Sequence, residues 1–171
     1  DPKVRPEAGP IIARVAAAYV QDQIEFSPQW QAIIGLRYDR FELDLHNNRS
    51  GQDLGSKDDL LSPRVGLVWK PVPEASIYGS YSVAYLPRSG EQLSSLSVSN
   101  AALDPEKYAN TEIGAKWQLT PEFNLSAAIY QLDRANVAVV DPADPTRLVL
   151  LPGDSQRVRG VELGIAGDIG E

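Results

Sequence analysis

Few side chains in this sequence could carry out catalysis or hold a metal ion. His46 is the single histidine, and the chain contains no cysteine. A Ser-His-Asp triad could use only His46, and no Gly-x-Ser-x-Gly nucleophile elbow accompanies it. The absence of cysteine removes disulfides and thiolate metal sites as well. We therefore expect a protein that is not an enzyme and that has no metal site and no cofactor.

Two other motifs resemble ligand sites only superficially. The glycines at 164, 167 and 170 end a predicted strand and open no helix, which a dinucleotide-binding turn would require. The segment 141–145 contains two aspartates, but it lacks the glycine of a calcium-binding loop. The net charge of −7 argues against nucleic acid as a partner, because phosphates favour a basic surface. The usual catalytic and nucleic-acid sites are therefore not expected.

The aromatic residues indicate a membrane. Each tryptophan, Trp30, Trp69 and Trp117, lies within four residues of a proline in a short turn, and Phe26 and Phe123 flank the same turns. Three tyrosines fall toward the other strand ends and are expected to face outward: Tyr38, Tyr81 and Tyr85. Aromatic belts at both lipid–water interfaces are typical of transmembrane β-barrels. The sequence therefore predicts an all-β, antiparallel transmembrane β-barrel segment.

Alternation of apolar and polar residues predicts about seven strands. They lie near 11–26, 30–46, 61–70, 75–85, 107–119, 122–136 and 156–169. Short turns near residues 28, 73 and 121 alternate with three long segments, 47–60, 86–106 and 137–155. Outer-membrane barrels have short periplasmic turns and longer external loops. We expect the turns on one side of the membrane and the long segments on the other.

The strand at 30–46 predicts which residues face lipid. From Trp30 to Tyr38 the even-numbered positions are mostly apolar. Beyond Tyr38 the apolar residues lie at odd-numbered positions, such as Phe41 and Leu45. We interpret the change as a β-bulge or as an extension of the strand above the membrane. The strand near 11–26 has no clean apolar face, so its orientation stays open. The charged wall residues are expected to point into the lumen: Arg37, Asp39, Arg64, Glu112, Lys116, Arg159 and Glu162.

A family resemblance runs along nearly the whole chain. Seven phrases follow one another as they do in TonB-dependent outer-membrane receptors, at 19–24, 35–39, 62–71, 78–82, 103–107, 112–117 and 159–163. The chain resembles most closely the ferric-siderophore receptors of the catecholate-like type. In those receptors a stretch similar to 85–92 begins a long external loop.

The resemblance implies a location, an activity and partners. Such receptors are outer-membrane barrels of about 22 strands with an N-terminal plug domain. They import ferric siderophores without catalysis, using energy passed from the inner-membrane TonB complex through the plug region. Their other contacts are outer-membrane lipid and lipopolysaccharide. Residues 1–171 are then expected to be a middle-to-late part of the barrel domain, with the plug and the C-terminal strands missing.

Under this resemblance, arginines and tyrosines are the candidate ligand-binding residues. Ferric chelates present flat rings and negative charge, which these side chains meet by stacking, cation–π contact and hydrogen bonds. We expect Tyr85, Arg88 and Arg147 near the external mouth, and Arg37 and Arg64 along the wall. The three long segments together carry four basic and nine acidic residues, so the few cations must offset a negative background.

Two other functions fit the same alternation. A passive porin or an adhesin-type barrel would have similar strands but would lack a plug domain. A soluble all-β carbohydrate-binding or hydrolase domain would instead carry loops of similar length at both ends of its strands. The unequal loop lengths favour a barrel, and the resemblance favours the energised receptor.

Overall fold

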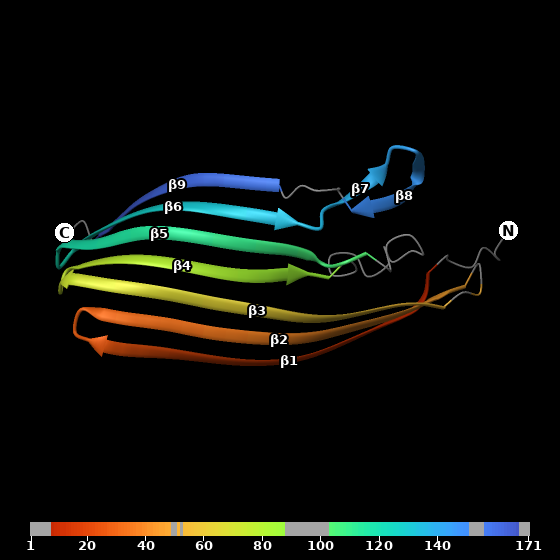
Figure 1. Ribbon diagram of the computed structural model, residues 1–171, viewed down its shortest axis with the longest axis horizontal. Coiled ribbons are helices and arrows are strands. Elements are labelled where there is room, and N and C mark those ends of the chain that lie inside the picture. Colours follow the sequence, from red (N-terminus) through yellow and green to blue (C-terminus); the bar gives the residue numbers. More distant parts are fainter. Residues whose placement is uncertain (1–7, 49–50, 52, 88–102, 151–155, 168–171) are drawn as a thin grey trace.

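The computed structural model describes residues 8–48, 51, 53–87, 103–150 and 156–167. Seven of its strands form one antiparallel sheet in the order β1-β2-β3-β4-β5-β6-β9, and β7 and β8 pair separately as a hairpin (Figure 1). The strands are β1 Ala8–Ser27, β2 Trp30–Asn47, β3 Asp53–Val72, β4 Ala75–Leu86, β5 Glu106–Thr120, β6 Phe123–Ala135, β7 Ala138–Asp141, β8 Asp144–Leu150 and β9 Gln156–Gly167. The described residues include no helix that is long and apolar enough to cross a membrane. The predicted all-β, antiparallel fold class is confirmed.

Two-residue turns that begin with Pro28, Pro73 and Pro121 join the strands at one end of the sheet. Proline fixes φ at a value that suits the first position of a tight turn. The hydroxyl oxygens of Ser27 and Thr120 each accept hydrogen bonds from two backbone amides of the adjoining turn, at 3.2–3.3 Å. All three turns lie at the left in Figure 1, and the β7–β8 hairpin lies at the opposite end. The predicted separation of turns and long segments is confirmed for the described residues.

Two of the segments predicted as loops contain strand. β3 begins at Asp53 rather than near 61, and β7 and β8 form within 137–155. The pairing of β2 with β3 runs without a shift from Trp30–Trp69 to His46–Asp53. The parity change after Tyr38 is therefore not a β-bulge. The other interpretation, an extension of the strand, is the correct one.

The extension reverses which face of the sheet is apolar. Beyond Tyr38, the leucines of β2 lie on the inner face, which also carries Arg37. Leu43 is fully buried there and packs with Leu45, Phe41 and Leu54. Water replaces lipid around the outer face at this height, so apolar side chains gain by turning inward.

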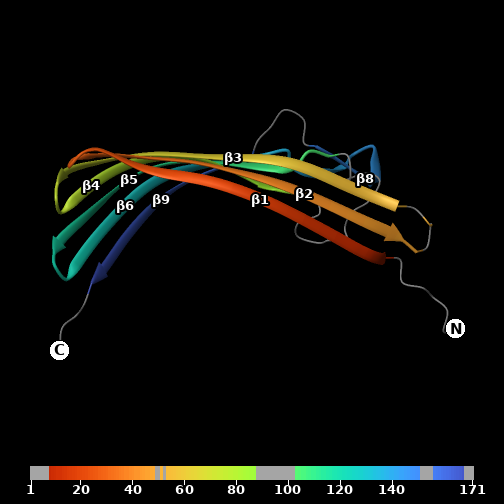
Figure 2. The same cartoon turned by 90° about the horizontal axis from the view of Figure 1, so that it is seen from below.

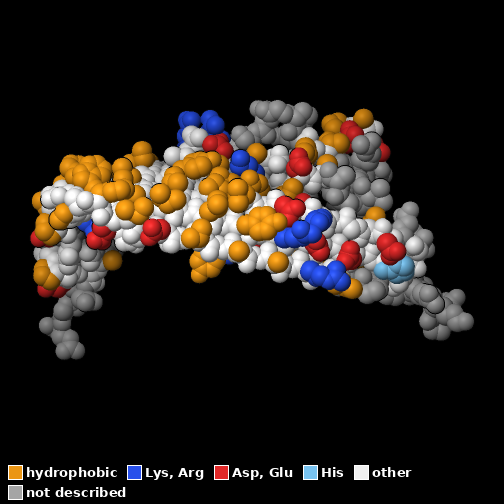
Figure 3. Space-filling view, turned by 60° about the horizontal axis from the view of Figure 1, so that its bottom comes forward, with side chains coloured by type: hydrophobic (Ala, Val, Ile, Leu, Met, Phe, Trp, Pro, Cys, Tyr) orange, Lys and Arg blue, Asp and Glu red, His pale blue; other side chains and the backbone are white. Residues whose placement is uncertain are grey.

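The outer face of the remaining sheet is an apolar band. Leu67 is 48% exposed and Leu163 is 83% exposed, and the rings of Trp30 and Trp69 stack at a centroid distance of 5.9 Å near the turns. Figure 3 shows apolar side chains over the turn half of this face and charged ones over the other half. A continuous exposed apolar surface needs a cover, and aromatic residues near the turns are typical of a cover of lipid. Figure 2 shows that the sheet is curved, as the wall of a barrel must be.

The register also determines two orientations that the sequence left open or assigned wrongly. In β1, Tyr19 pairs with Arg37 and therefore shares the inner face, whereas Val20 pairs with Leu36 on the outer face. Arg159 was predicted to point into the lumen, but it shares the outer face with Val161. Its Nε donates to Gln131 Oε1 at 2.9 Å. Arg159 lies beyond the apolar band, where the outer face is polar.

An arginine in the apolar band should destabilise the folded protein much more than an arginine on the inner face. We expect Leu67→Arg to cost about 2–4 kcal/mol, because the charge would meet lipid, and Ser80→Arg to cost much less. Denaturant titration of the protein folded into lipid vesicles would measure both changes. Equal costs would show that the two faces are assigned wrongly.

Candidate functional site

The inner face of the sheet contains an open hollow of about 1170 Å³ that side chains of β1 to β5 line. Its floor is formed by small residues, including Gly35, Gly66, Ser80 and Ser82. These positions alternate with the lipid-facing residues of the same strands, so short side chains here leave space inside without weakening the outer band. The hollow is the main candidate site for a solute.

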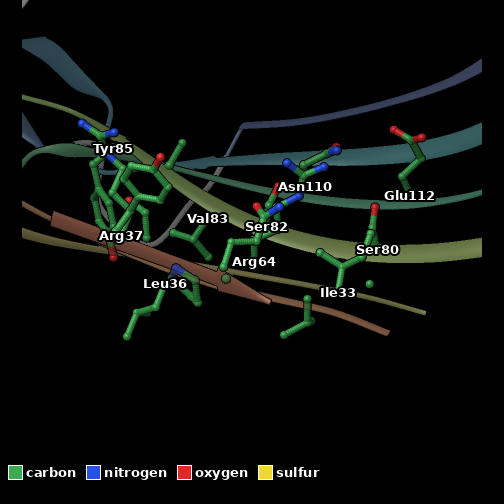
Figure 4. A pocket seen from close by; sticks show the side chains of 18 of the residues that line it. Ile33, Leu36, Arg37, Arg64, Ser80, Ser82, Val83, Tyr85, Asn110 and Glu112 are labelled. Atoms are coloured by element: carbon green, nitrogen blue, oxygen red, sulfur yellow. The ribbon is translucent and has the colours of Figure 1, made fainter. Parts of the chain in front are cut away.

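The structure brings three of the predicted site residues together in this hollow, namely Arg37, Arg64 and Tyr85. Figure 4 shows Tyr85 and Arg37 at one end of the hollow and Glu112 toward the other, with Arg64 between them. Tyr85 was also predicted to face outward with Tyr81; the unshifted pairing of β4 with β5 gives both tyrosines the same parity, yet Tyr85 borders the hollow. The described pairing of β3 with β4 ends at Arg64 and Ser82, and the strands then diverge (Figure 1), so that Tyr85 lines the hollow.

The two wall arginines differ in their surroundings. Arg37 is already paired, because its Nε lies 3.0 and 2.8 Å from the two carboxylate oxygens of Asp39 and its Nη2 lies 2.7 Å from Oδ1. Arg64 is exposed, and no described carboxylate pairs with it. The charge of Arg37 is therefore largely neutralised by Asp39, whereas no described carboxylate neutralises that of Arg64.

The remaining two predicted residues are not tested. Arg88 lies outside the described residues, and Arg147 belongs to β8 but its side chain is not described. Their place at the external mouth stays a prediction.

A polar group that the sequence did not single out as a site lies deeper in the hollow. The Tyr78 hydroxyl donates to Glu112 Oε1 at 2.6 Å, and Lys116 Nζ lies 5.8 Å from the centre of the Tyr78 ring. The Tyr78 ring covers Gly114 on the next strand, so closely that a Cβ there would be 2.5 Å from it. Alternation had assigned Glu112 and Lys116 to the inner face, but only the cross-strand register brings them together with Tyr78.

A second polar group lies where β5 begins and β6 ends, away from the proline turns. Arg134 donates from Nε and Nη2 to Glu106 Oε2 at 2.8 and 2.6 Å, and the Tyr108 hydroxyl donates to the same oxygen at 2.8 Å. Next to it, Asn136 has a positive φ of 58° and donates from its side chain to the Pro105 carbonyl at 2.9 Å. These contacts fix the point where the connection into β5 meets the start of the β7–β8 hairpin.

The described arrangement is suited to binding. Among the described residues, no three histidine, cysteine, aspartate or glutamate side chains are grouped as metal ligands. The hollow offers a guanidinium, an ammonium group, phenols and serine hydroxyls. Such donors bind anionic or ring-bearing solutes by hydrogen bonds and stacking.

Comparison with known proteins agrees with this architecture. Residues 7–170 match the family described as TonB dependent receptor-like, beta-barrel. The chain is 32% identical over 163 residues to the probable TonB-dependent siderophore receptor PiuA of Acinetobacter baumannii, covering 90% of this chain and 21% of that protein. It is 33% identical over 172 residues to the probable TonB-dependent receptor BfrD of Bordetella pertussis, covering 91% and 22%.

A solved structure shows the same fold. The crystal structure of the siderophore receptor PiuA from Acinetobacter baumannii superposes with a TM-score of 0.81 at 29% identity, covering 94% of this chain and 24% of that one. The chain thus spans about a fifth of the length of PiuA and of BfrD.

The packing of Tyr78 on Gly114 gives a test of the inner wall. Gly66, another inner-face glycine, has nothing closer than 3.6 Å to an added Cβ. Gly114→Ala should displace the Tyr78 ring, break its hydrogen bond to Glu112 and cost about 1 kcal/mol through overpacking. Gly66→Ala should instead be neutral or stabilise by about 0.5 kcal/mol, because alanine restricts the unfolded chain. Denaturant titration in vesicles would compare them, and equal effects would contradict this packing.

Proposed function

This chain belongs to the TonB-dependent receptor β-barrel family of the bacterial outer membrane, and from this we propose that it forms part of the wall of a receptor that imports ferric siderophores. The observation that carries the proposal is the hollow on the inner face, which the exposed cation of Arg64 and the phenols of Tyr78 and Tyr85 all line. The name of the relative PiuA, a siderophore receptor, supports the same ligand class. Transport in this proposal is energised and involves no catalytic step.

We propose that residues 1–171 are part of a larger barrel domain. In the described sheet, β1 and β9 are edge strands, each paired on one side only. Unpaired backbone groups are not tolerated in lipid, so the barrel would need further strands to close. The relatives, which are about five times longer than the matched region, supply room for these strands and for a plug domain. The plug region would contact the TonB complex.

The ligand would enter at the end of the barrel opposite the proline turns. Tyr85, together with Arg88 and Arg147, is proposed to meet the ferric chelate at the mouth. Arg37 and Arg64 are proposed to contact it along the wall. The charged outer collar beyond the apolar band would lie among the lipopolysaccharide headgroups; it includes the ion pairs Arg14–Asp44 and Arg157–Asp133, at 2.8 and 2.6 Å.

The alternatives are not favoured. A passive porin or adhesin-type barrel would share the strands but not the family match along residues 7–170. A soluble carbohydrate-binding domain would expose its apolar band to water, at a large hydrophobic cost.

The proposal predicts that the intact receptor binds ferric chelates and that Arg88→Ala weakens this binding. Loss of one desolvated charge-assisted contact costs about 1.5–3 kcal/mol, or roughly ten-fold or more in Kd. Equilibrium binding of ferric catecholates and hydroxamates to purified wild type and variant would measure it, with assembly of the barrel as the control. If the wild type binds no ferric chelate, the siderophore assignment is wrong. If it binds them and Arg88→Ala changes none, the assignment stands and the placement of Arg88 is wrong.

A further inference from the structure

We propose that Arg134 is a positioning residue, which holds the root of the β7–β8 hairpin at one place on the wall and thereby places the ligand contacts that the hairpin carries. The ligand part of the inference rests on the proposed function, because β8 includes Arg147, one of the residues proposed to meet the ferric chelate at the mouth. The position of the hairpin itself is a property of the folded wall and needs no ligand.

In the described residues, the backbone ladder of the seven-stranded sheet does not extend into the β7–β8 hairpin, whose two strands pair only with each other. Figure 1 shows the hairpin beyond the ends of β5 and β6. Only residues 136 and 137 separate the end of β6 from the start of β7. The direction in which the hairpin leaves the wall is therefore set at this short root.

Arg134 lies at the end of β6 and contacts the strands on both sides. It pairs with Tyr108 of β5 and with Gln156 of β9. Its Nε and Nη2 donate to Glu106 Oε2 at 2.8 and 2.6 Å, and its Nη1 donates to Gln156 Oε1 at 3.3 Å. Its Cζ lies 5.6 Å from the centre of the Tyr108 ring, within range of a cation–π contact. One guanidinium thus joins β6, which leads into the hairpin, to β9, which follows it, and to β5.

The main partner of Arg134 is a buried carboxylate. Glu106 is only 9% exposed, and the Tyr108 hydroxyl donates to the same Glu106 oxygen as Arg134 does. A buried charge is costly unless it is paired and hydrogen-bonded. The Glu106 carboxylate would lose two donors if Arg134 moved away, so the guanidinium is held in one place.

The residues that follow Arg134 turn the chain toward the hairpin and are fixed as well. Asn136 has a φ of 58°, in the left-handed region that asparagine adopts more readily than most residues. Its side chain donates to the Pro105 carbonyl at 2.9 Å, and the next residue, Val137, is only 5% exposed. Arg134 fixes where this turn begins, and Asn136 fixes its direction. A hairpin on such a root has one preferred position.

A ligand contact from the hairpin depends on that position. The apparent affinity of a site falls in proportion to the fraction of molecules in which the binding residues are in place. Loss of the Arg134 contacts should let the hairpin take several positions, so that contacts from β8 are present only part of the time. Arg134 would thus influence binding without touching the chelate.

The experiment measures the position of the hairpin in the intact receptor, by pulsed EPR distances between two spin labels. Ala143 is exposed in the turn between β7 and β8, and Ala115 is exposed on the outer face of β5, so the labels are attached through Ala143→Cys and Ala115→Cys. Arg134→Gln should broaden the distance distribution about two-fold or more, because a segment that loses its anchoring contacts samples more positions.

Arg157→Gln is the matched control. Arg157 also forms an ion pair close to the ends of β6 and β9, with Asp133 at 2.6 Å, but it shares the outer face with Arg159. It is not among the described contacts of Glu106 or of Asn136. This variant should leave the distances unchanged.

Binding is measured on the same variants without labels, with a ferric tris(catecholate) and a ferric tris(hydroxamate) as probes. Arg134→Gln should weaken binding by the factor by which the population at the original distance falls, about five-fold if about a fifth remains. Arg134→Lys should recover part of both changes, since it keeps the charge but loses the paired donors. A residue that contributed only to stability would not produce this match between distance and affinity.

Asn136→Asp tests the same root at a second position, should Arg134→Gln fail to assemble. Aspartate tolerates a positive φ as asparagine does, but it replaces the donor to the Pro105 carbonyl by an acceptor. This variant should also broaden the distances and weaken binding in proportion.

The outcomes separate this inference from the proposed function. If neither Arg134→Gln nor Asn136→Asp changes the distances more than Arg157→Gln does, Arg134 does not position the hairpin. The inference is also wrong if the distances broaden while a wild type that binds a ferric chelate loses no affinity. If the wild type binds no ferric chelate, the proposed function fails and the ligand role of Arg134 fails with it, while the distances still decide whether Arg134 holds the hairpin.

Discussion

The pairing of backbone amides and carbonyls along seven neighbouring strands is the constraint on which the rest of this structure depends. Lipid offers no hydrogen-bonding partner, so each strand that crosses it must be paired on both sides without interruption. Continuous pairing from Trp30–Trp69 to His46–Asp53 fixes the direction of every side chain on β2 and β3. A shift of one residue would exchange the lipid-facing and lumen-facing side chains. Polar side chains would then face lipid, which is energetically unfavourable.

Because the ladder stays continuous, a change of environment along the strands is met by a change of side-chain type. Near the turns, apolar residues lie outside and small or polar residues lie inside. Beyond Tyr38 the outer face carries ion pairs such as Arg14–Asp44, and Leu43 is buried on the inner face. One set of strands therefore serves two surroundings, lipid and water, with no break in its backbone.

The same constraint shapes the candidate site. Strands that must stay evenly spaced can make room in the lumen only through small side chains on the inner face. Glycines and serines of β2, β3 and β4 do this around Arg64, and Gly114 makes room for the Tyr78 ring deeper in the wall. Spacing along a strand also decides which charges are neutralised. Arg37 and Arg64 are both wall arginines in the sequence, but among the described residues only Arg37 has a carboxylate within reach, that of Asp39 two residues along the same face of β2.

The sequence by itself determined the fold class, the proline turns, the lipid-facing parity of the even residues from Trp30 to Tyr38, and the family. All of these depend on local patterns, namely alternation with period two and aromatic residues near turns. The start of β3 at Asp53, the place of Tyr85 beside the hollow and the orientation of β1 were decided only by the tertiary structure. Each depends on which residue lies across on the neighbouring strand and on where two strands separate. A single strand read alone does not contain that information, because its hydrogen-bonding partners are distant in sequence.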